Sequence, residues 1–146
     1  MSMKLLSPLD SIEEVDGLAR AGAGEFFCGV LEDRWHEKYP VISINRRPAG
    51  KGHFRRFADL KEAVARSHGL GIPVYFTVNE HYYTQAQYDL VRWYLDSAAD
   101  ARVDAFIITD FGLRNATPRY SGGVSEILDW IAFTGEACVD GRADRP

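Results

Sequence analysis

Four short apolar segments alternate with amphipathic segments along this chain, and this alternation limits the fold more than any other feature. The apolar segments cover residues 4–7, 25–30, 73–78 and 105–109, and each has the length of a β-strand. The last is almost continuously apolar, as strands covered on both faces are. Strands separated by helices pair in parallel through right-handed crossovers. The order therefore predicts an α/β protein built from parallel β/α repeats.

Helices are predicted between these strands from the spacing of apolar and capping residues. Ser11 and Glu14 have the spacing of a capping box, as do Thr84 and Gln87, and a helix is expected to open at each pair. A third helix is expected over residues 57–69, where glycine provides a C-terminal cap. The helices would supply the crossovers that parallel strands need.

Two architectures fit this order of elements. One is an open, doubly wound sheet, and the other is the first half of an eight-stranded TIM-type barrel, which ordinarily needs about 250 residues. The chain has 146 residues, which favours the open sheet or a fragment of the barrel. Its two cysteines, Cys28 and Cys138, are too few for a disulfide framework or for a cysteine-only metal site.

Two segments depart from the repeating pattern. Residues 31–57 form a long connection rich in arginine, lysine and histidine, with little amphipathic order, and connections of this length are often functional. Residues 114–146 contain one plausible helix, over residues 124–133, followed by residues without a strand signal. We therefore divide the chain into partial barrel-like repeats over residues 1–113 and a divergent tail over residues 114–146.

Charge and hydropathy narrow the range of partners. The formal net charge of −4 argues against a generic nucleic-acid binder. The sequence contains neither a membrane-spanning run of about 18 apolar residues nor a secretory signal, so we expect a cytoplasmic protein that does not bind membranes. Its expected partner is a peptide or small-molecule substrate.

Polar residues follow the predicted strands, at the edge where α/β proteins bind ligands. Glu80 and Asp110 follow two neighbouring strands, so one cleft can hold both carboxylates for acid–base catalysis or for a divalent cation. No other cofactor is predicted. The alternative is that Asp110 caps the following turn and that Glu80 is solvated. Asn79 is predicted to orient a substrate carbonyl or to bond to its own turn.

Basic residues provide candidates for substrate binding. Arg46 and Arg47 suit bidentate capture of a carboxylate or phosphate, or else belong to a solvated loop. His81 neighbours Glu80, and His36 lies in the long connection; the histidines show no metal-binding spacing. Cys28, near the end of a strand, is expected to be a buried thiol rather than a nucleophile.

A collinear set of short segments resembles the N-terminal half of the U32 peptidase (collagenase-like protease) family. The resemblance covers roughly residues 3–113, and its segments are residues 4–8, 21–30, 35–39, 43–47, 73–79, 82–84 and 103–113. It implies a TIM-type barrel whose first four strands are those predicted above, and it implies peptide hydrolase activity.

The resemblance also implies alternatives to peptidase activity. The family includes proteins associated with oxygen-independent hydroxylation of ubiquinone precursors and RNA bases, in which cysteines of the later barrel half bind an iron–sulfur cluster. This chain lacks that half, so we expect a truncated or frame-disrupted member, with four strands followed by unrelated residues. The remaining alternatives are a non-catalytic fragment or binding module, or a relative of the hydroxylation proteins without the cluster. Open sheet edges would favour a homodimer.

Overall fold

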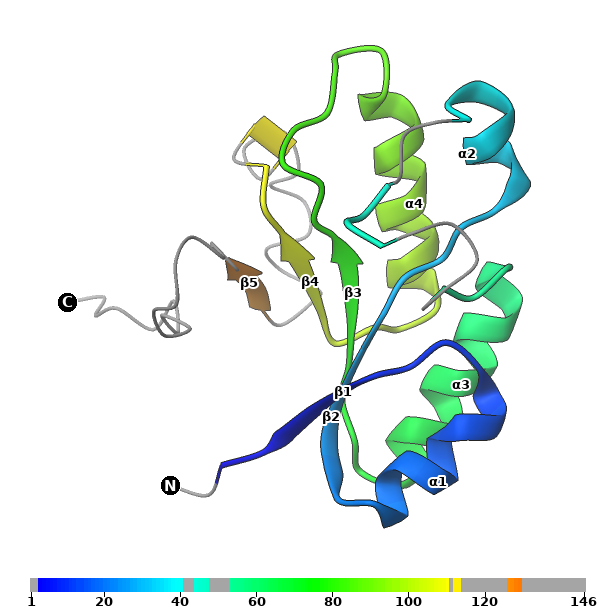
Figure 1. Ribbon diagram of the computed structural model, residues 1–146, viewed down its shortest axis with the longest axis vertical. Helices are drawn as coiled ribbons and strands as arrows, with labels where there is room; N and C mark the ends of the chain where they lie inside the picture. Colours follow the sequence, from blue (N-terminus) through cyan, green and yellow to red (C-terminus); the bar gives the residue numbers. More distant parts are fainter. Residues whose placement is uncertain (1–2, 41–43, 48–52, 111, 114–125, 130–146) are drawn as a thin grey trace, which may run out of the picture.

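The sheet of this protein is parallel throughout, and its strands lie side by side in chain order (Figure 1). The computed structural model describes residues 3–40, 44–47, 53–110, 112–113 and 126–129. The five strands are β1 (Leu5–Pro8), β2 (Ala23–Cys28), β3 (Val74–Val78), β4 (Ala105–Ile108) and β5 (Glu126–Asp129). The predicted α/β class and the four predicted strands are confirmed.

The fifth strand corrects the prediction for the tail. A helix was expected over residues 124–133, but residues 126–129 pair in parallel with β4, with Ala105 opposite Glu126 and Ile108 opposite Asp129. The free edge of β4 offers unpaired backbone N–H and C=O groups, and pairing with this edge overrides the local helical pattern. The sheet therefore does not stop at four strands.

Among the described residues, the helices that cross between successive strands lie on one side of the sheet (Figure 1). They are α1 (Val15–Arg20), which follows the 3₁₀ turn η1 (Ile12–Glu14), then α3 (Phe57–Gly69) and α4 (Tyr88–Asp100). A doubly wound sheet carries helices on both faces and reverses its strand order at a switch point. The observed order contains no reversal among the described strands, and it is consistent with half of a barrel.

The long connection over residues 31–57 contains a helix that was not predicted, α2 (Asp33–Lys38). Trp35 in this helix is fully buried, and its ring packs edge-on against Tyr94 of α4 at a centroid distance of 5.9 Å. Burial of one large aromatic side chain stabilises a fold by roughly 1.5–3 kcal/mol, enough to hold so short a helix. Tertiary packing rather than an amphipathic pattern therefore forms α2.

The predicted Thr84–Gln87 capping box forms in part, and the predicted Ser11–Glu14 box does not form. Gln87 Oε1 accepts a hydrogen bond from Thr84 N at 2.8 Å, but α4 begins only at Tyr88. Glu14 Oε2 accepts from Asp10 N at 3.4 Å, whereas Ser11 makes no side-chain capping bond. In both cases the side chain of Glu14 or Gln87 accepts a backbone hydrogen bond, whereas the hydroxyl of Ser11 or Thr84 does not cap the helix.

A carboxylate that is distant in the sequence accepts a hydrogen bond from the first residue of helix α3. Its N-cap position holds Arg56, whose side chain makes no capping bond. Glu32 Oε1 instead accepts a hydrogen bond from Phe57 N at 3.3 Å. Glu32 N donates in turn to Tyr94 Oη at 3.1 Å, so one residue joins α2, α3 and α4. Negative charge at a helix N-terminus also interacts favourably with the helix dipole.

The core lies between the sheet and its helices. Phe76 of β3 is fully buried at its centre, with Phe57 of α3 at 5.9 Å and Phe106 of β4 at 6.3 Å between ring centroids. Because paired residues in a parallel sheet point to the same face, the pairs Cys28–Phe76 and Phe76–Phe106 place these three side chains toward the helices. Their neighbours in sequence therefore point to the opposite face.

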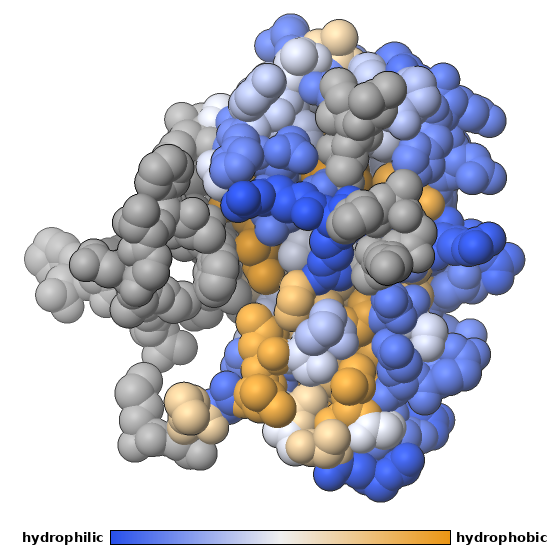
Figure 2. All heavy atoms as spheres, viewed as in Figure 1, coloured by the Kyte–Doolittle hydropathy of each residue, from blue (hydrophilic) through white to orange (hydrophobic). Residues whose placement is uncertain are grey.

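That opposite face carries apolar side chains near the β1 edge. Leu5 and Leu6 of β1 are 59% and 37% exposed. Figure 2 shows hydrophobic atoms gathered over β1 and the strands beside it, and hydrophilic atoms toward the end where the strands terminate. The carboxyl ends of the strands are thus the polar end of this face.

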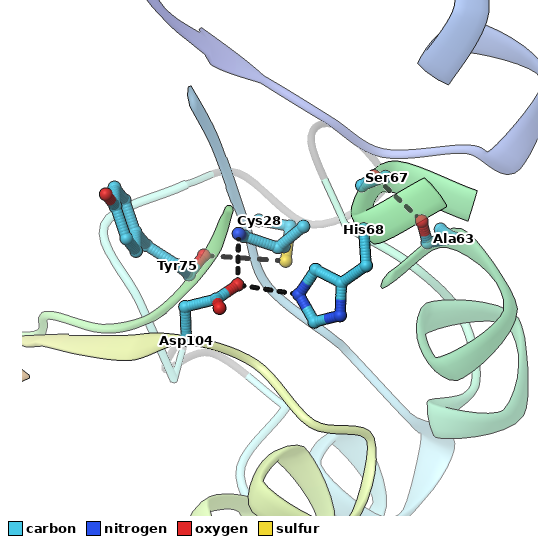
Figure 3. Close-up of polar contacts among 7 residues, drawn as sticks. Cys28, Ala63, Ser67, His68, Tyr75 and Asp104 are labelled. Carbon is cyan, nitrogen blue, oxygen red and sulfur yellow. Dashed lines mark hydrogen bonds and ion pairs between the residues drawn. The ribbon is translucent and has the colours of Figure 1, made fainter. Parts of the chain in front are cut away.

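At the amino-terminal end of the sheet, polar contacts among His68, Asp104 and Val74 join neighbouring elements, and we call this group the latch (Figure 3). Asp104 Oδ2 accepts a hydrogen bond from Val74 N at 2.7 Å and lies 2.8 Å from His68 Nε2. Figure 3 also shows the Cys28 thiol directed at the Tyr75 carbonyl, at 3.6 Å. The latch joins the end of α3 to the starts of β3 and β4.

Among the described helices, none has both the length and the apolar character needed to span a membrane.

Candidate functional site

The carboxyl ends of β2, β3 and β4 meet at one edge because these strands are parallel. Three segments gather there: residues 44–47 of the long connection, the loop of residues 79–87 after β3, and Asp110 after β4. This edge is where ligands bind in parallel α/β proteins. The candidate site is described from these three segments.

Tyr83 joins all three segments. Its backbone N donates to Asp110 Oδ2 at 2.8 Å, and its hydroxyl donates to the Ile44 carbonyl at 2.5 Å. The same hydroxyl oxygen accepts from Glu80 N at 3.1 Å. Burial raises the pKa of Tyr83 far above its ordinary value, so the hydroxyl stays protonated and acts as a donor. Tyr83 therefore fixes the positions of the segments that carry the predicted residues.

Asp110 uses both carboxylate oxygens to hold the backbone. Besides the bond from Tyr83, its Oδ1 accepts from Gly112 N at 2.7 Å and from Leu113 N at 3.2 Å. The residue is buried. These contacts match the alternative in which Asp110 caps the turn after its strand.

Glu80 differs from Asp110 in its surroundings. It is half-buried, and its Oε1 accepts a hydrogen bond from His81 N at 3.0 Å. Among the described residues, no other hydrogen bond involves this carboxylate. Glu80 and Asp110 both raise the pKa of Tyr83 through their charges, so the two acids lie around one side chain. Asp110 contacts the backbone N of Tyr83, and the Glu80 backbone contacts its hydroxyl, so the two acids lie near opposite ends of Tyr83.

A buried asparagine organises the neighbouring strand ends. Asn45 is fully buried, and its Nδ2 lies 3.4 Å from Thr77 Oγ1, which donates to the Cys28 carbonyl at 2.8 Å. Its Oδ1 lies 2.7 Å from His53 Nε2 and accepts from Arg47 N at 3.2 Å. This Asn45 network ties the long connection to β2 and β3.

Gly29 allows the Asn45 network to approach β2 closely. A Cβ atom at this position would lie 2.4 Å from Asn45 Nδ2 and 3.2 Å from Thr77 Oγ1, so only glycine fits. Asn45, His53 and Thr77 were not among the predicted site residues. Their polar side chains carried no spacing signal, because their meeting depends on how residues 44–54 fold back over β2 and β3.

The two predicted substrate-binding arginines occupy different environments. The Arg47 guanidinium is half-buried and lies 4.5 Å from the centre of the Phe27 ring. Burial lowers the pKa of Arg47. Arg46 is exposed, and its backbone N donates to Asn79 Oδ1 at 3.4 Å. Asn79 thus contacts the arginine segment rather than its own turn.

The two predicted histidines lie on different elements. His36 is half-buried on α2, and His81 is exposed in the loop after β3. Tyr39, directly after α2, contacts this loop, because its hydroxyl donates to the Ala86 carbonyl at 2.9 Å. Within the described ranges, neither imidazole forms a hydrogen bond with Arg46 or Arg47.

Cys28 is a structural residue, as expected. Its side chain is fully buried, and burial raises the pKa of the thiol to about 12. A thiol with this pKa is not a nucleophile near neutral pH. Cys138 lies outside the described residues. In the part of the chain that the structure describes, no group of three or more His, Cys, Asp or Glu side chains is placed to hold a metal ion.

Comparison with known proteins gives one match. The family model described as peptidase family U32 matches residues 10–124. The match reaches past the end of the segments recognised in the sequence, to within two residues of β5. No curated protein and no solved structure matches the chain significantly.

Proposed function

Because this chain belongs to peptidase family U32, we propose that it acts in peptide hydrolysis at the carboxyl ends of its strands. The observation that carries this proposal is the position of Glu80, a half-buried carboxylate at the polar edge of the sheet. A carboxylate in such a position can accept a proton from water and donate one to a leaving amine.

The contacts suggest a distinct role for each predicted residue. We assign acid–base catalysis to Glu80 and orientation of the substrate carbonyl to Asn79. Asp110 is proposed as a positioning residue, because both of its oxygens accept backbone hydrogen bonds. We propose that Arg46, Arg47, His36 and His81 bind the peptide.

For the fold, we propose a partial TIM-type barrel. Support comes from a sheet whose order follows the chain and from helices confined to one side of it. In a complete barrel the same arrangement places every helix outside and every carboxyl strand end at one mouth. We also propose a cytoplasmic location, which a buried free thiol at Cys28 suits.

The second candidate function is a binding module without catalysis. The observation that favours it is Asp110, whose two carboxylate oxygens both accept backbone hydrogen bonds and therefore hold the turn rather than face a substrate. A relationship to the hydroxylation proteins has less support. The described residues include one cysteine, and its thiol is fully buried, which does not suit a ligand of an iron–sulfur cluster.

A peptidase assay on the full chain tests these proposals. Glu80→Gln is expected to lower kcat about 100-fold, the usual contribution of a general acid or base. Glu62→Gln, at an exposed position on α3, is the matched control and should leave turnover unchanged. Equal turnover in the Glu80→Gln variant would reject the assigned site. No turnover by the unsubstituted chain would favour the binding module.

The assay also tests a divalent cation at Glu80 and Asp110. Asp110 would have to give up backbone hydrogen bonds to bind one, so we expect turnover to persist after treatment with a chelator. Turnover that is lost with the chelator and restored by Mg²⁺ or Mn²⁺ would place a cation in the reaction.

We propose in addition that two copies pair through the β1 edge. The exposed side chains of Leu5 and Leu6 on this edge strand support pairing. Sedimentation should show a dimer that Leu5→Lys disrupts. A monomer at all concentrations would reject it.

A further inference from the structure

We propose that Tyr83 is a positioning residue for the reaction. Its hydroxyl group holds the backbone of Glu80 against the segment of residues 44–47, so that the catalytic carboxylate and the peptide-binding arginines are set in place together. This inference rests on the proposed function and adds a residue through which the two parts of that site depend on each other. Tyr83 acts through Glu80 and is not assigned a contact with the substrate.

The Tyr83 hydroxyl lies between the two parts of the site. It accepts a hydrogen bond from Glu80 N at 3.1 Å and donates one to the Ile44 carbonyl at 2.5 Å. Tyr83 and Ile44 are both buried, so these bonds form where water has little access and where each is costly to lose. Burial also raises the pKa of Tyr83, which keeps the proton that the bond to Ile44 needs.

The backbone of Tyr83 is fixed to the sheet independently of its hydroxyl. Tyr83 N donates to Asp110 Oδ2 at 2.8 Å, directly after β4. The other oxygen of the same carboxylate accepts from Gly112 N at 2.7 Å, so Asp110 is itself held. The Tyr83 ring therefore presents its hydroxyl from a fixed point, and this group can define the position of whatever it binds.

The Glu80 side chain depends on the backbone that Tyr83 holds. Its Oε1 accepts a hydrogen bond from His81 N at 3.0 Å, the amide directly after the one that binds the Tyr83 hydroxyl. The direction of the carboxylate is thus tied to the orientation of the Glu80 backbone. A general acid or base must lie within hydrogen-bond reach of its proton, and a misplacement of about 1 Å can cost about 100-fold in rate.

The arginine segment depends on the same hydroxyl. Two hydrogen bonds tie residues 44–47 to the residues that follow β3. Arg46 N donates directly to Asn79 Oδ1 at 3.4 Å, and the Ile44 carbonyl is joined to Glu80 N through the Tyr83 hydroxyl. Loss of the hydroxyl leaves the longer of these connections, so substrate binding and catalysis should both be affected.

Peptidase kinetics on the full chain test the inference through a double-mutant cycle. Tyr83→Phe should lower kcat about tenfold and raise KM. In the Glu80→Gln background the same substitution should lower kcat no further, because its effect on kcat passes through Glu80, whereas the rise in KM should persist. Tyr82→Phe removes a hydroxyl from the neighbouring exposed position and should change neither constant.

A second control separates positioning from loss of stability. Val64→Ala removes buried methyl groups from α3 and destabilises the fold away from the strand ends. With kcat expressed per folded molecule, Val64→Ala should match the unsubstituted chain. The inference is overturned if Val64→Ala lowers kcat as much as Tyr83→Phe does, if Tyr83→Phe leaves kcat unchanged, or if its effect adds in full to that of Glu80→Gln.

An NMR measurement tests the positioning without turnover. The three-bond coupling between the backbone nitrogen and Cγ of Glu80 reports its χ1 rotamer. We expect the value of a single rotamer in the unsubstituted chain, in Tyr82→Phe and in Val64→Ala, and an averaged value in Tyr83→Phe. Averaging in Tyr83→Phe by a chain without turnover would reject the peptidase proposal and keep the contact. Turnover together with an unchanged coupling in Tyr83→Phe would reject the positioning role alone.

Discussion

The two ends of the sheet are held by polar contacts of different kinds. At the amino-terminal end, the latch of His68, Asp104 and Val74 uses side chains that are 38% and 34% exposed for the histidine and aspartate. At the carboxyl end, Asn45 is fully buried and Tyr83 is 5% exposed. The first end joins regular elements that the core already aligns. The second holds irregular backbone over the strand ends, where buried hydrogen bonds replace regular pairing.

The largest effect is expected where one buried side chain serves several partners. Asn45→Ala removes the bonds to Thr77, His53 and the Arg47 backbone and leaves buried polar groups without that partner. We expect a loss of about 3 kcal/mol in the free energy of unfolding, measured by urea denaturation. A loss below about 1 kcal/mol would show that the carboxyl end does not depend on this network.

Tyr83→Phe tests the second buried connection at the same end. The variant keeps the ring but loses the hydroxyl bonds to the Ile44 carbonyl and the Glu80 backbone. We expect a loss of about 2 kcal/mol in unfolding free energy, together with faster amide hydrogen exchange in residues 44–47. Tyr82→Phe, at a position that is 74% exposed, is the matched control and should change neither quantity. Equal behaviour of the two variants would contradict the role given to Tyr83.

His68→Gln tests the latch at the amino-terminal end. Partly exposed polar pairs contribute little, so we expect a loss of about 0.5 kcal/mol in unfolding free energy. The exposed His81→Gln serves as its control. If His68→Gln destabilised the protein as much as Asn45→Ala, the contrast between the two ends would be wrong.

The smallest effect is expected from the ion pair of Asp16 with Arg66, which joins α1 to α3. The hydrogen bond from Arg66 lowers the pKa of Asp16 below its ordinary value of 3.8. The pair therefore stabilises the folded state above that pH, and its contribution is lost as the pH falls through the lowered pKa. The difference in Tm between the unsubstituted chain and Asp16→Asn should be small at pH 6 and smaller at pH 3. A difference that grows toward pH 3 would contradict this assignment.

Regular elements were predictable because their signals are local. The four strands follow from apolar runs, and α3 ends at Gly69 as the glycines indicated. The buried thiol of Cys28 and the capping contacts of Asp110 also agree with expectations drawn from residue type alone. By contrast, α2 forms because Trp35 finds a partner in Tyr94, which lies 59 positions further along the chain. β5 forms because β4 offers an edge.

The candidate site also contains residues whose positions followed from local sequence signals and residues whose positions depended on tertiary packing. The sequence placed Asn79, Glu80 and Asp110 at one edge, because parallel strands bring their carboxyl ends together. It presented Arg46 and Arg47 as alike, and the packing of residues 44–47 made one exposed and set the other against Phe27. Asn45, Thr77 and His53 met only through that same packing.

What the sequence determined by itself was the order of the first four strands with α1, α3 and α4 between them, the parallel sheet that this order requires, and the U32 relationship. Tertiary structure alone decided which polar groups are used to hold the backbone and which face the edge of the site. The physical reason is the distance along the chain over which each effect acts. Periodicity and capping act over a few residues, whereas the partners of a buried polar group are chosen among segments that approach only after the core has formed.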